Sequence, residues 1–454
     1  MRPILPALAI AALLPLGAAG ATAVAPAASV PDADRIVSRT LDNGLQIIVW
    51  PDHDIPNVSY YTYYKAGGRN EYPGITGLAH YFEHMMFNGT AKRAPGSFDR
   101  EMEAAGGSNN AWTSADLTAY TNWFPRQALE TIFDLEADRM GQLDFDPKVV
   151  ESERGVVHSE RRLRVDSDNF GALREQMQAT AYLAHPYQFP VIGWPSDIEK
   201  WSIDDLRDFY TTYYAPNNAV LVITGDVQPA EVFALAEKHL APLPRQPEPR
   251  QVTTVEPQQQ GERRLVIEKP GAQAPLLVQA YHTGVRAADA EAPALDMLLA
   301  ILSRGDSSRL TQRLVEREQL AVDVGSYAHK GFDPGLLWVY AVLPPGGDLA
   351  RAEAVLDDEL ARIARDGVSA AEMAKARNLL LAQFWRGMAT INGKASALAS
   401  HQVFHGDWRA MLGVPAALEA VAARDVQALA ARILKSSNRT TGILQPVPAQ
   451  EDAR

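Results

Sequence analysis

The stretch Leu45-Gln-Ile-Ile-Val-Trp-Pro51, followed by Ile55-Pro-Asn-Val-Ser-Tyr-Tyr-Thr-Tyr-Tyr64, has a counterpart in the second half of the chain. The counterpart is Leu265-Val-Ile-Glu-Lys-Pro270, followed by Ala274-Pro-Leu-Leu-Val-Gln-Ala-Tyr-His-Thr283. Both stretches are rich in residues that favour β-strands, and both are divided by a turn that contains proline. The sequence therefore predicts two similar strand pairs, about 220 residues apart.

An apolar helix is expected after each strand pair, over 77–87 in the first half and over 292–302 in the second. Further helices are predicted by cap residues or periodicity at Asp146–Arg164, from Ser202, and over 349–365 and 370–388. Because strands and helices follow in the same order twice, the chain is predicted to be a duplicated α+β domain.

A linker separates the two halves. Residues 241–261 read APLPRQPEPRQVTTVEPQQQG, with four prolines in the first nine positions. This composition cannot bury a core and predicts an exposed, semi-rigid connection. The expected organisation is a first domain over residues 35–240 and a homologous second domain over residues 262–446.

The composition excludes several classes of protein. The 454 residues include 43 Lys and Arg against 55 Asp and Glu, a net charge of −12, so the basic excess of a duplex-binding protein is absent. There is no cysteine, which excludes disulfides, thiolate zinc sites, iron–sulfur clusters and a cysteine nucleophile. A transition-metal site in this chain must use His, Asp and Glu, and there are only ten histidines.

Residues 1–25 are interpreted as a signal peptide. A basic start at Met1-Arg2 precedes an apolar segment and a run of small residues that ends at Ala25. The alternative is a membrane anchor, but the apolar run is short and interrupted by Pro6 and Pro15. No later stretch is long and apolar enough to span a membrane, so we expect a periplasmic protein without a membrane span.

The sharpest chemical signal is His80-Tyr-Phe-Glu83-His84. On a helix, His80 and His84 are four residues apart and share one face, which suits two nitrogen ligands of one Zn²⁺. Glu83 is placed to hold a water molecule rather than the metal, as in the inverted zinc-peptidase motif. The alternative is a helix that carries two surface histidines by chance.

The segment Glu153-Arg-Gly-Val-Val-His-Ser-Glu160 contains candidates for a third zinc ligand. Glu153 and Glu160 are seven residues apart and share a helix face, where burying two carboxylates without a cation is costly. The alternative is that this face is exposed. His158 points away from Glu160 on a helix and is expected to be a surface residue.

Together these segments resemble the pitrilysin (insulinase) family of zinc peptidases, and within it the bacterial subfamily similar to mitochondrial processing peptidase. Further agreement lies in Gly106-Gly-Ser-Asn-Asn-Ala-Trp-Thr-Ser-Ala-Asp-Leu-Thr-Ala-Tyr120 and in His185-Pro-Tyr-Gln-Phe-Pro-Val-Ile-Gly193. The resemblance extends from about residue 35 to about residue 446. It implies two homologous α+β roll domains that face each other across a cavity.

The resemblance also implies roles for individual residues. His80, His84 and Glu160 become the ligands of one Zn²⁺ per chain, Glu83 the general base and Glu153 the carboxylate that supports the site. Residues 108–113 resemble the edge strand that binds substrate peptides by strand addition, with Asn110 and Ala111 as the expected contacts. For Asn110, a turn residue is the alternative.

The chain departs from the family pattern in its second half. Single-chain members carry an Arg and a Tyr seven residues apart that hold the substrate carbonyl, but the aligned positions here are Val315 and Val322. We therefore expect a heterodimer with a homologous, metal-free chain that carries this pair. The alternative is a homodimer or a monomer in which Tyr327, His329 or a nearby Arg substitutes.

Three functions are compatible with these observations to different degrees. The favoured one is a periplasmic zinc endopeptidase, of the inverted His-x-x-Glu-His type, that hydrolyses peptides or unfolded segments. The second is a non-catalytic zinc-binding subunit with an interaction or chaperone role, but a purely structural zinc would not need Glu83. The third is a periplasmic binding protein with two lobes, which explains the duplication and leaves the His and Glu motifs as coincidences.

Overall fold

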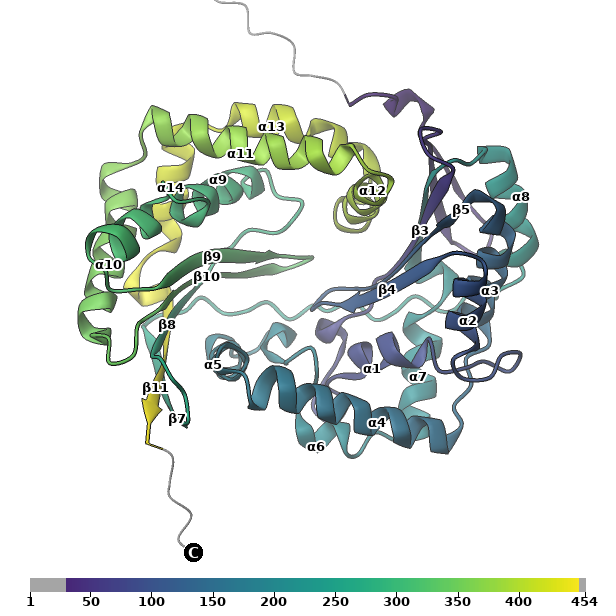
Figure 1. The fold of residues 1–454 in the computed structure, drawn as a ribbon, viewed down its shortest axis with the longest axis horizontal. Coiled ribbons are helices and arrows are strands. Elements are labelled where there is room, and N and C mark those ends of the chain that lie inside the picture. Colours follow the sequence, from purple (N-terminus) through teal and green to yellow (C-terminus); the bar gives the residue numbers. More distant parts are fainter. Residues whose placement is uncertain (1–29, 449–454) are drawn as a thin grey trace, which may run out of the picture.

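The computed structural model describes residues 30–448, so the signal peptide predicted at residues 1–25 lies outside the described residues. The first half of the chain forms a six-stranded sheet in the order β1-β2-β6-β3-β5-β4 (Figure 1). Its strands are β1 (Val37–Thr40), β2 (Gln46–Pro51), β3 (Asn57–Tyr64), β4 (Ser108–Thr113), β5 (Thr118–Pro125) and β6 (Ala219–Gly225).

The second half repeats this topology in a five-stranded sheet, in the order β7-β11-β8-β10-β9. Its strands are β7 (Arg263–Pro270), β8 (Leu276–His282), β9 (Asp323–Lys330), β10 (Pro334–Val342) and β11 (Arg439–Val447). In each sheet the first strand of the repeat pairs in parallel with the last (β2 with β6, β7 with β11), and the other pairs are antiparallel. The predicted duplicated α+β fold is thereby confirmed.

Helices of the same half cover one face of each sheet. On the first sheet these are α1 (Leu78–Met85), α2 (Ser97–Ala104), α3 (Leu129–Gly141), α4 (Pro147–Arg161), α6 (Pro195–Ile198), α7 (Ile203–Tyr213) and α8 (Pro229–His239). On the second they are α9 (Ala292–Ser303), α10 (Leu349–Asp366), α11 (Ala370–Met388), α13 (Val414–Ala420) and α14 (Ala423–Ile433).

The opposite face of each sheet is covered by a helix from the other half (Figure 1). Helix α12 (Ile391–His405) packs Leu398 and Val403 against Trp50 and Val222 of the first sheet. Helix α5 (Asn169–Ala181) packs Leu173 and Met177 among the inner residues of the second sheet. Both sheets are therefore buried on both faces, and each half completes the core of the other.

The turn between β9 and β10 inserts into the first half at Asp116, whose carboxylate is fully buried. Asp116 accepts a hydrogen bond from the Tyr187 hydroxyl at 2.6 Å and pairs with His329 Nε2 at 2.7 Å. Next to it, Asp333 of the turn pairs with Arg69 and with His185. These contacts hold the two halves together beside the cavity between them.

Residues 241–262 contain no helix or strand and run from one half to the other. Within residues 30–448, no helix is both long and apolar enough to cross a membrane.

Candidate metal centre

Helix α1 places His80 and His84 on one face, as the spacing predicts. A carboxylate starts this helix: Glu71 accepts hydrogen bonds from the Gly77 and Ala79 amides at 2.7 and 2.8 Å. Gly77 has a φ of +90°, and a Cβ there would lie 2.6 Å from the Ile192 carbonyl oxygen, so only glycine fits. The start of α1, and with it the direction of both imidazoles, is therefore rigidly defined.

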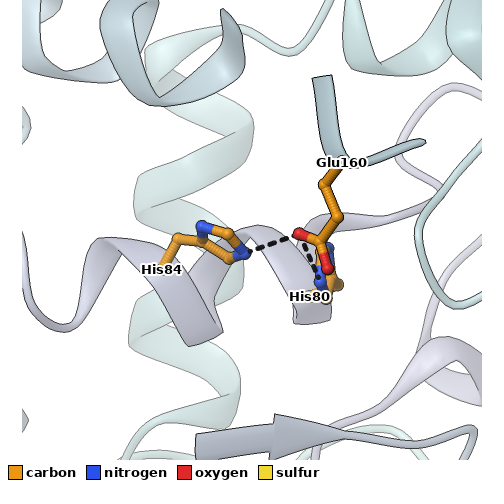
Figure 2. A group of neighbouring side chains, drawn as sticks. All are labelled: His80, His84 and Glu160. Carbon is orange, nitrogen blue, oxygen red and sulfur yellow. Dashed lines mark ion pairs between the residues drawn. The ribbon is translucent and has the colours of Figure 1, made fainter. Parts of the chain in front are cut away.

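Helix α4 brings Glu160 to the two histidines. It begins as predicted, with the Asp146 side chain accepting from the Lys148 amide at 2.7 Å and Pro147 in the first turn. The Tyr81 hydroxyl of α1 donates to the Val150 carbonyl at 2.7 Å and fastens the two helices together. Figure 2 shows the outcome, with the Glu160 carboxylate facing both rings.

The three side chains have the spacing of metal ligands. Glu160 Oε2 lies 3.5 Å from His80 Nε2 and 3.3 Å from His84 Nε2. Two ligands bound tetrahedrally at Zn²⁺ distances of about 2.0–2.1 Å are roughly 3.4 Å apart. The ligand atoms of all three residues lie within 4.8 Å of one another. The donor set and its geometry therefore fit a zinc ion.

The electrostatics of the cluster favour a cation. Burial and the neighbouring His84 lower the pKa of His80 to about 4, so this ring is neutral. Burial opposes charge on His84, but hydrogen bonds to Glu153 and Glu160 raise its pKa to about 9. The hydrogen bond from His84 lowers the pKa of Glu160 to about 2. The carboxylates of Glu153 and Glu160 both face the His84 ring, and Glu160 also pairs with Arg164. A divalent cation would replace the proton of His84 as the positive charge between the two carboxylates.

Glu153 lies behind His84 and does not join the ligand cluster. Its Oε1 is 2.8 Å from His84 Nδ1, the nitrogen that faces away from Glu160. A carboxylate in this position fixes the tautomer of a metal-binding histidine. His158, which the sequence analysis expected to be a surface residue, is half-buried and outside the cluster.

Glu83 points to the same site from α1 and is held by the edge strand. Its Oε2 accepts a hydrogen bond from the Thr113 hydroxyl of β4 at 2.7 Å. Burial raises the pKa of Glu83, and the Thr113 hydrogen bond opposes that rise. Thr113 was not singled out from the sequence, although it belongs to the stretch recognised as an edge strand.

Asn110 and Ala111 lie on β4, which is an edge strand with β5 as its only neighbour. The Ser114 amide donates to the Leu117 carbonyl at 2.8 Å, and together with the register this bond determines which residues of β4 are hydrogen-bonded to β5. In an antiparallel pair the residues alternate, so Asn110 bonds to β5 while the backbone of Ala111 faces the free edge. The Ala111 amide is occupied by the Asn110 side chain, with N···Oδ1 2.9 Å.

A cavity of about 630 Å³ adjoins these residues and lies between the two halves. The first half contributes His80, Glu83, Glu160 and residues of β4, and the second half contributes residues of β9 and β10. Arg164 lines it and pairs with Glu160, with Nε···Oε1 2.9 Å.

The two valines of the second half are not among the residues that line this cavity. Val315 packs at the edge of the second core, and Val322 is 62 % exposed. Tyr327 and His329, the substitutes considered from the sequence, both line the cavity.

Known proteins are similar to this one over nearly the whole chain. A family model described as Insulinase (Peptidase family M16) matches residues 51–193, and one described as Peptidase M16 inactive domain matches residues 200–380. Zinc protease PqqE from Helicobacter pylori is 30 % identical over 415 residues, which cover 90 % of this chain and 92 % of that protein. An uncharacterized zinc protease from Mycobacterium leprae is 30 % identical over 400 residues, covering 87 % and 88 %.

Solved structures share the fold. The crystal structure of a protease from Helicobacter pylori has a TM-score of 0.87 at 29 % identity and covers 90 % of this chain and 99 % of that one. The periplasmic protease PqqL from Escherichia coli has a TM-score of 0.76 at 21 % identity, covering 92 % of this chain and 48 % of that one. With these matches, the chain belongs to the insulinase family of peptidases, family M16.

Proposed function

We propose that this protein is a zinc-dependent endopeptidase that hydrolyses peptides or unfolded segments. The observation that carries the proposal is the arrangement of two histidines and a glutamate at ligand spacing, with Glu83 in the same cavity and free of the ligand cluster. A structural metal needs no such extra carboxylate. The names of the relatives, which are called zinc proteases, support the same conclusion.

His80, His84 and Glu160 would hold the zinc, and Glu153 would orient His84. Zinc bound there would supply Lewis-acid polarisation of the scissile carbonyl and activation of a water molecule. The buried, neutral ring of His80 is ready to bind without first losing a proton. All of these residues lie within the match to residues 51–193, and the word "inactive" describes the separate match to residues 200–380, which contains none of them.

Glu83 would be the general base. With Oε2 held by Thr113, its Oε1 is left to accept a proton from the attacking water and deliver it to the leaving amine. A raised pKa suits this task, because a carboxyl group that holds its proton more firmly is a stronger base before transfer.

The substrate would bind as an added strand along the free edge of β4. There the backbone of Ala111 would bond to the peptide, and the Asn110 side chain would have to release the Ala111 amide. Main-chain pairing of this kind requires an extended substrate, which favours peptides and unfolded segments over folded proteins.

The setting of the enzyme is also a proposal. We infer export to the periplasm through a signal peptide at residues 1–25, followed by domains over 35–240 and 262–446 with a linker at 241–261. Support comes from the basic and apolar composition of the leader and from the name of the fold neighbour, the periplasmic protease PqqL.

A second, homologous chain without a metal motif is the proposed partner. Support comes from the valines at 315 and 322, where the Arg and Tyr of single-chain members are missing. In addition, this chain corresponds to only 48 % of the PqqL chain. A homodimer is the alternative.

The decisive experiment uses Glu83→Gln. This variant should bind zinc and peptide as the wild type does, yet lose roughly 10²–10⁴-fold in kcat, because a proton acceptor has gone while every ligand remains. Metal content, peptide affinity and hydrolysis of a quenched peptide should be measured together, with the exposed Glu103→Gln as the control.

If the wild-type protein takes up zinc but hydrolyses nothing, alone or with partner chains, the non-catalytic subunit becomes the better account. If it cannot take up zinc at all, the proposed ligand set is wrong.

A further inference from the structure

The cavity between the halves contains one cationic side chain without an acidic partner. Arg164 pairs with Glu160, the ring of His80 beside it is neutral, and His329 Nε2 lies 2.7 Å from a carboxylate oxygen of Asp116. Arg174, on α5, lines the same cavity and makes no ion pair within residues 30–448. In a chain of net charge −12, an unpaired guanidinium beside a proposed active site calls for an explanation.

Contacts within α5 do not supply one. Side chains three or four positions away on a helix are its natural partners, and around Arg174 these are Phe170, Gly171, Met177 and Gln178. The adjacent Glu175 is already taken by a buried pair with Arg161, with Nη1···Oε2 2.6 Å. Arg174, which is exposed, therefore has no acidic partner on its own helix.

One neighbour of Arg174, Tyr327, belongs to the second half of the chain. Tyr327 of β9 stacks on Trp338 of β10 with ring centroids 5.9 Å apart and planes at 7°, and both rings line the cavity. Burial raises the pKa of Tyr327 to about 12, and the neighbouring Arg174 guanidinium opposes that rise. The guanidinium thus sits beside a neutral phenol and an aromatic wall, where its planar fork is available for a planar anion.

We propose that Arg174 binds a carboxylate of the substrate and thereby determines specificity. The inference rests on the proposed peptidase function and deepens it, by naming acidic peptides as the preferred substrates. A guanidinium matches a carboxylate with two parallel hydrogen bonds. An acidic side chain and the C-terminus of a short peptide present the same carboxylate group, so either can be the source.

The test compares quenched peptides that differ only in charge. One pair has a free or an amidated C-terminus, and a second pair has an internal Glu or Gln on one side of the scissile bond. The wild-type protein should favour the carboxylate member of at least one pair by roughly tenfold in KM, with similar kcat. The pair that shows the preference identifies the source of the carboxylate.

Variants at position 174 should change this charge preference. Arg174→Gln should abolish the preference, Arg174→Glu should reverse it, and Arg174→Lys should retain part of it, because Lys keeps the charge and loses the fork. The exposed Arg424→Gln is the control for the loss of one positive charge. A merely structural role of Arg174 would lower activity toward both members of a pair equally.

Binding separates this inference from the proposed function. The same peptides, labelled and followed by fluorescence anisotropy, should show the charge preference in Glu83→Gln as well. Hydrolysis without any charge preference, or a preference that survives Arg174→Gln, would overturn the role of Arg174 and leave the peptidase standing. A charge preference in binding without hydrolysis would keep Arg174 and reject the peptidase.

Discussion

Glu153 and Glu160 lie on one helix and face opposite nitrogens of the same ring. Glu153 is 2.8 Å from Nδ1 of His84, and Glu160 is 3.3 Å from Nε2. In the proposed metal site, the first contact would fix which nitrogen of His84 is free to bind the metal, so the geometry of the three ligands would depend on a residue outside the cluster.

Removing that support should weaken the metal site. We expect Glu153→Ala to lower zinc affinity by about 10- to 100-fold, and Glu153→Gln to cost less, because its amide oxygen can still accept from Nδ1. Competition with a chelator of known affinity measures both, and Glu151→Gln, whose side chain is 76 % exposed on the same helix, is the control. Unchanged affinity in Glu153→Ala would remove Glu153 from the site.

The sequence predicts which residues are candidate ligands better than it predicts the contacts around them. The spacing of His80 and His84 predicts a shared helix face, but Glu160 follows 76 residues after His84. The two carboxylates on one helix face pointed to this segment, and only the resemblance identified Glu160 rather than Glu153 as the third ligand. Thr113 was missed because its contact with Glu83 depends on how β4 packs against α1. Arg164 was missed because it reaches Glu160 through a long, flexible side chain. Neither contact leaves a periodic signal.

Among the strands of residues 30–448, β4 lies at an edge of its sheet, and this unpaired edge adjoins the cavity. Its side chains alternate. Asn109 and Thr113 point to the helices, where they contact Asp99 and Glu83, while the backbone groups of the same residues and of Ala111 face the free edge. An added strand would therefore meet backbone groups at every second residue.

This alternation gives a prediction for substrates. N-methylation of single peptide bonds should impair binding with a period of two, since only alternate amides of an added strand pair with β4. A methylation scan of one peptide, measured with the Glu83→Gln variant to prevent turnover, would test it. Uniform effects along the peptide would indicate recognition through side chains, and β4 would then lose its proposed role.

Helix ends were predicted well where a cap residue marks them. Asp146 and Ser202 begin α4 and α7 as expected, and α11 spans the predicted residues 370–388. The end of α4 was placed too late. It stops at Arg161 and continues as a wider turn over Arg162–Asp166, a change that no residue in the segment signals.

In the whole molecule, the two repeats are interlocked. Each sheet alternates its apolar side chains between its own helices and one helix from the other half, which is why β3 and β8 are buried on both faces. The duplication was evident from the strand pairs, but this exchange was not. Both α5 and α12 look like ordinary helices of their own half until the sheets that they cover are known.

The exchange predicts that neither half folds alone. A fragment ending in the linker, at about residue 250, would expose Ile48, Trp50, Tyr63, Val220 and Val222 to water, and burial of each large apolar side chain is worth about 1.5–3 kcal/mol. We expect each fragment to aggregate when expressed alone, and the two to copurify when expressed together. A soluble, cooperatively melting first fragment would show that α12 is dispensable for its core.

The last prediction concerns a second chain. Valine side chains cannot donate a hydrogen bond to a developing oxyanion, a contribution worth roughly 10²–10³ in rate, and Val315 and Val322 do not line the cavity in any case. Adding a homologous chain that carries the Arg and Tyr pair should therefore raise kcat by about that factor and saturate at one partner per chain. The complex should contain one zinc per pair, and Glu83→Gln in this chain should silence it, because the partner has no metal motif.

If the purified protein is fully active alone and no homologous chain changes its rate, the donor must belong to this chain. Tyr327→Phe and His329→Ala would then be the variants to compare, since both residues line the cavity and the valines do not.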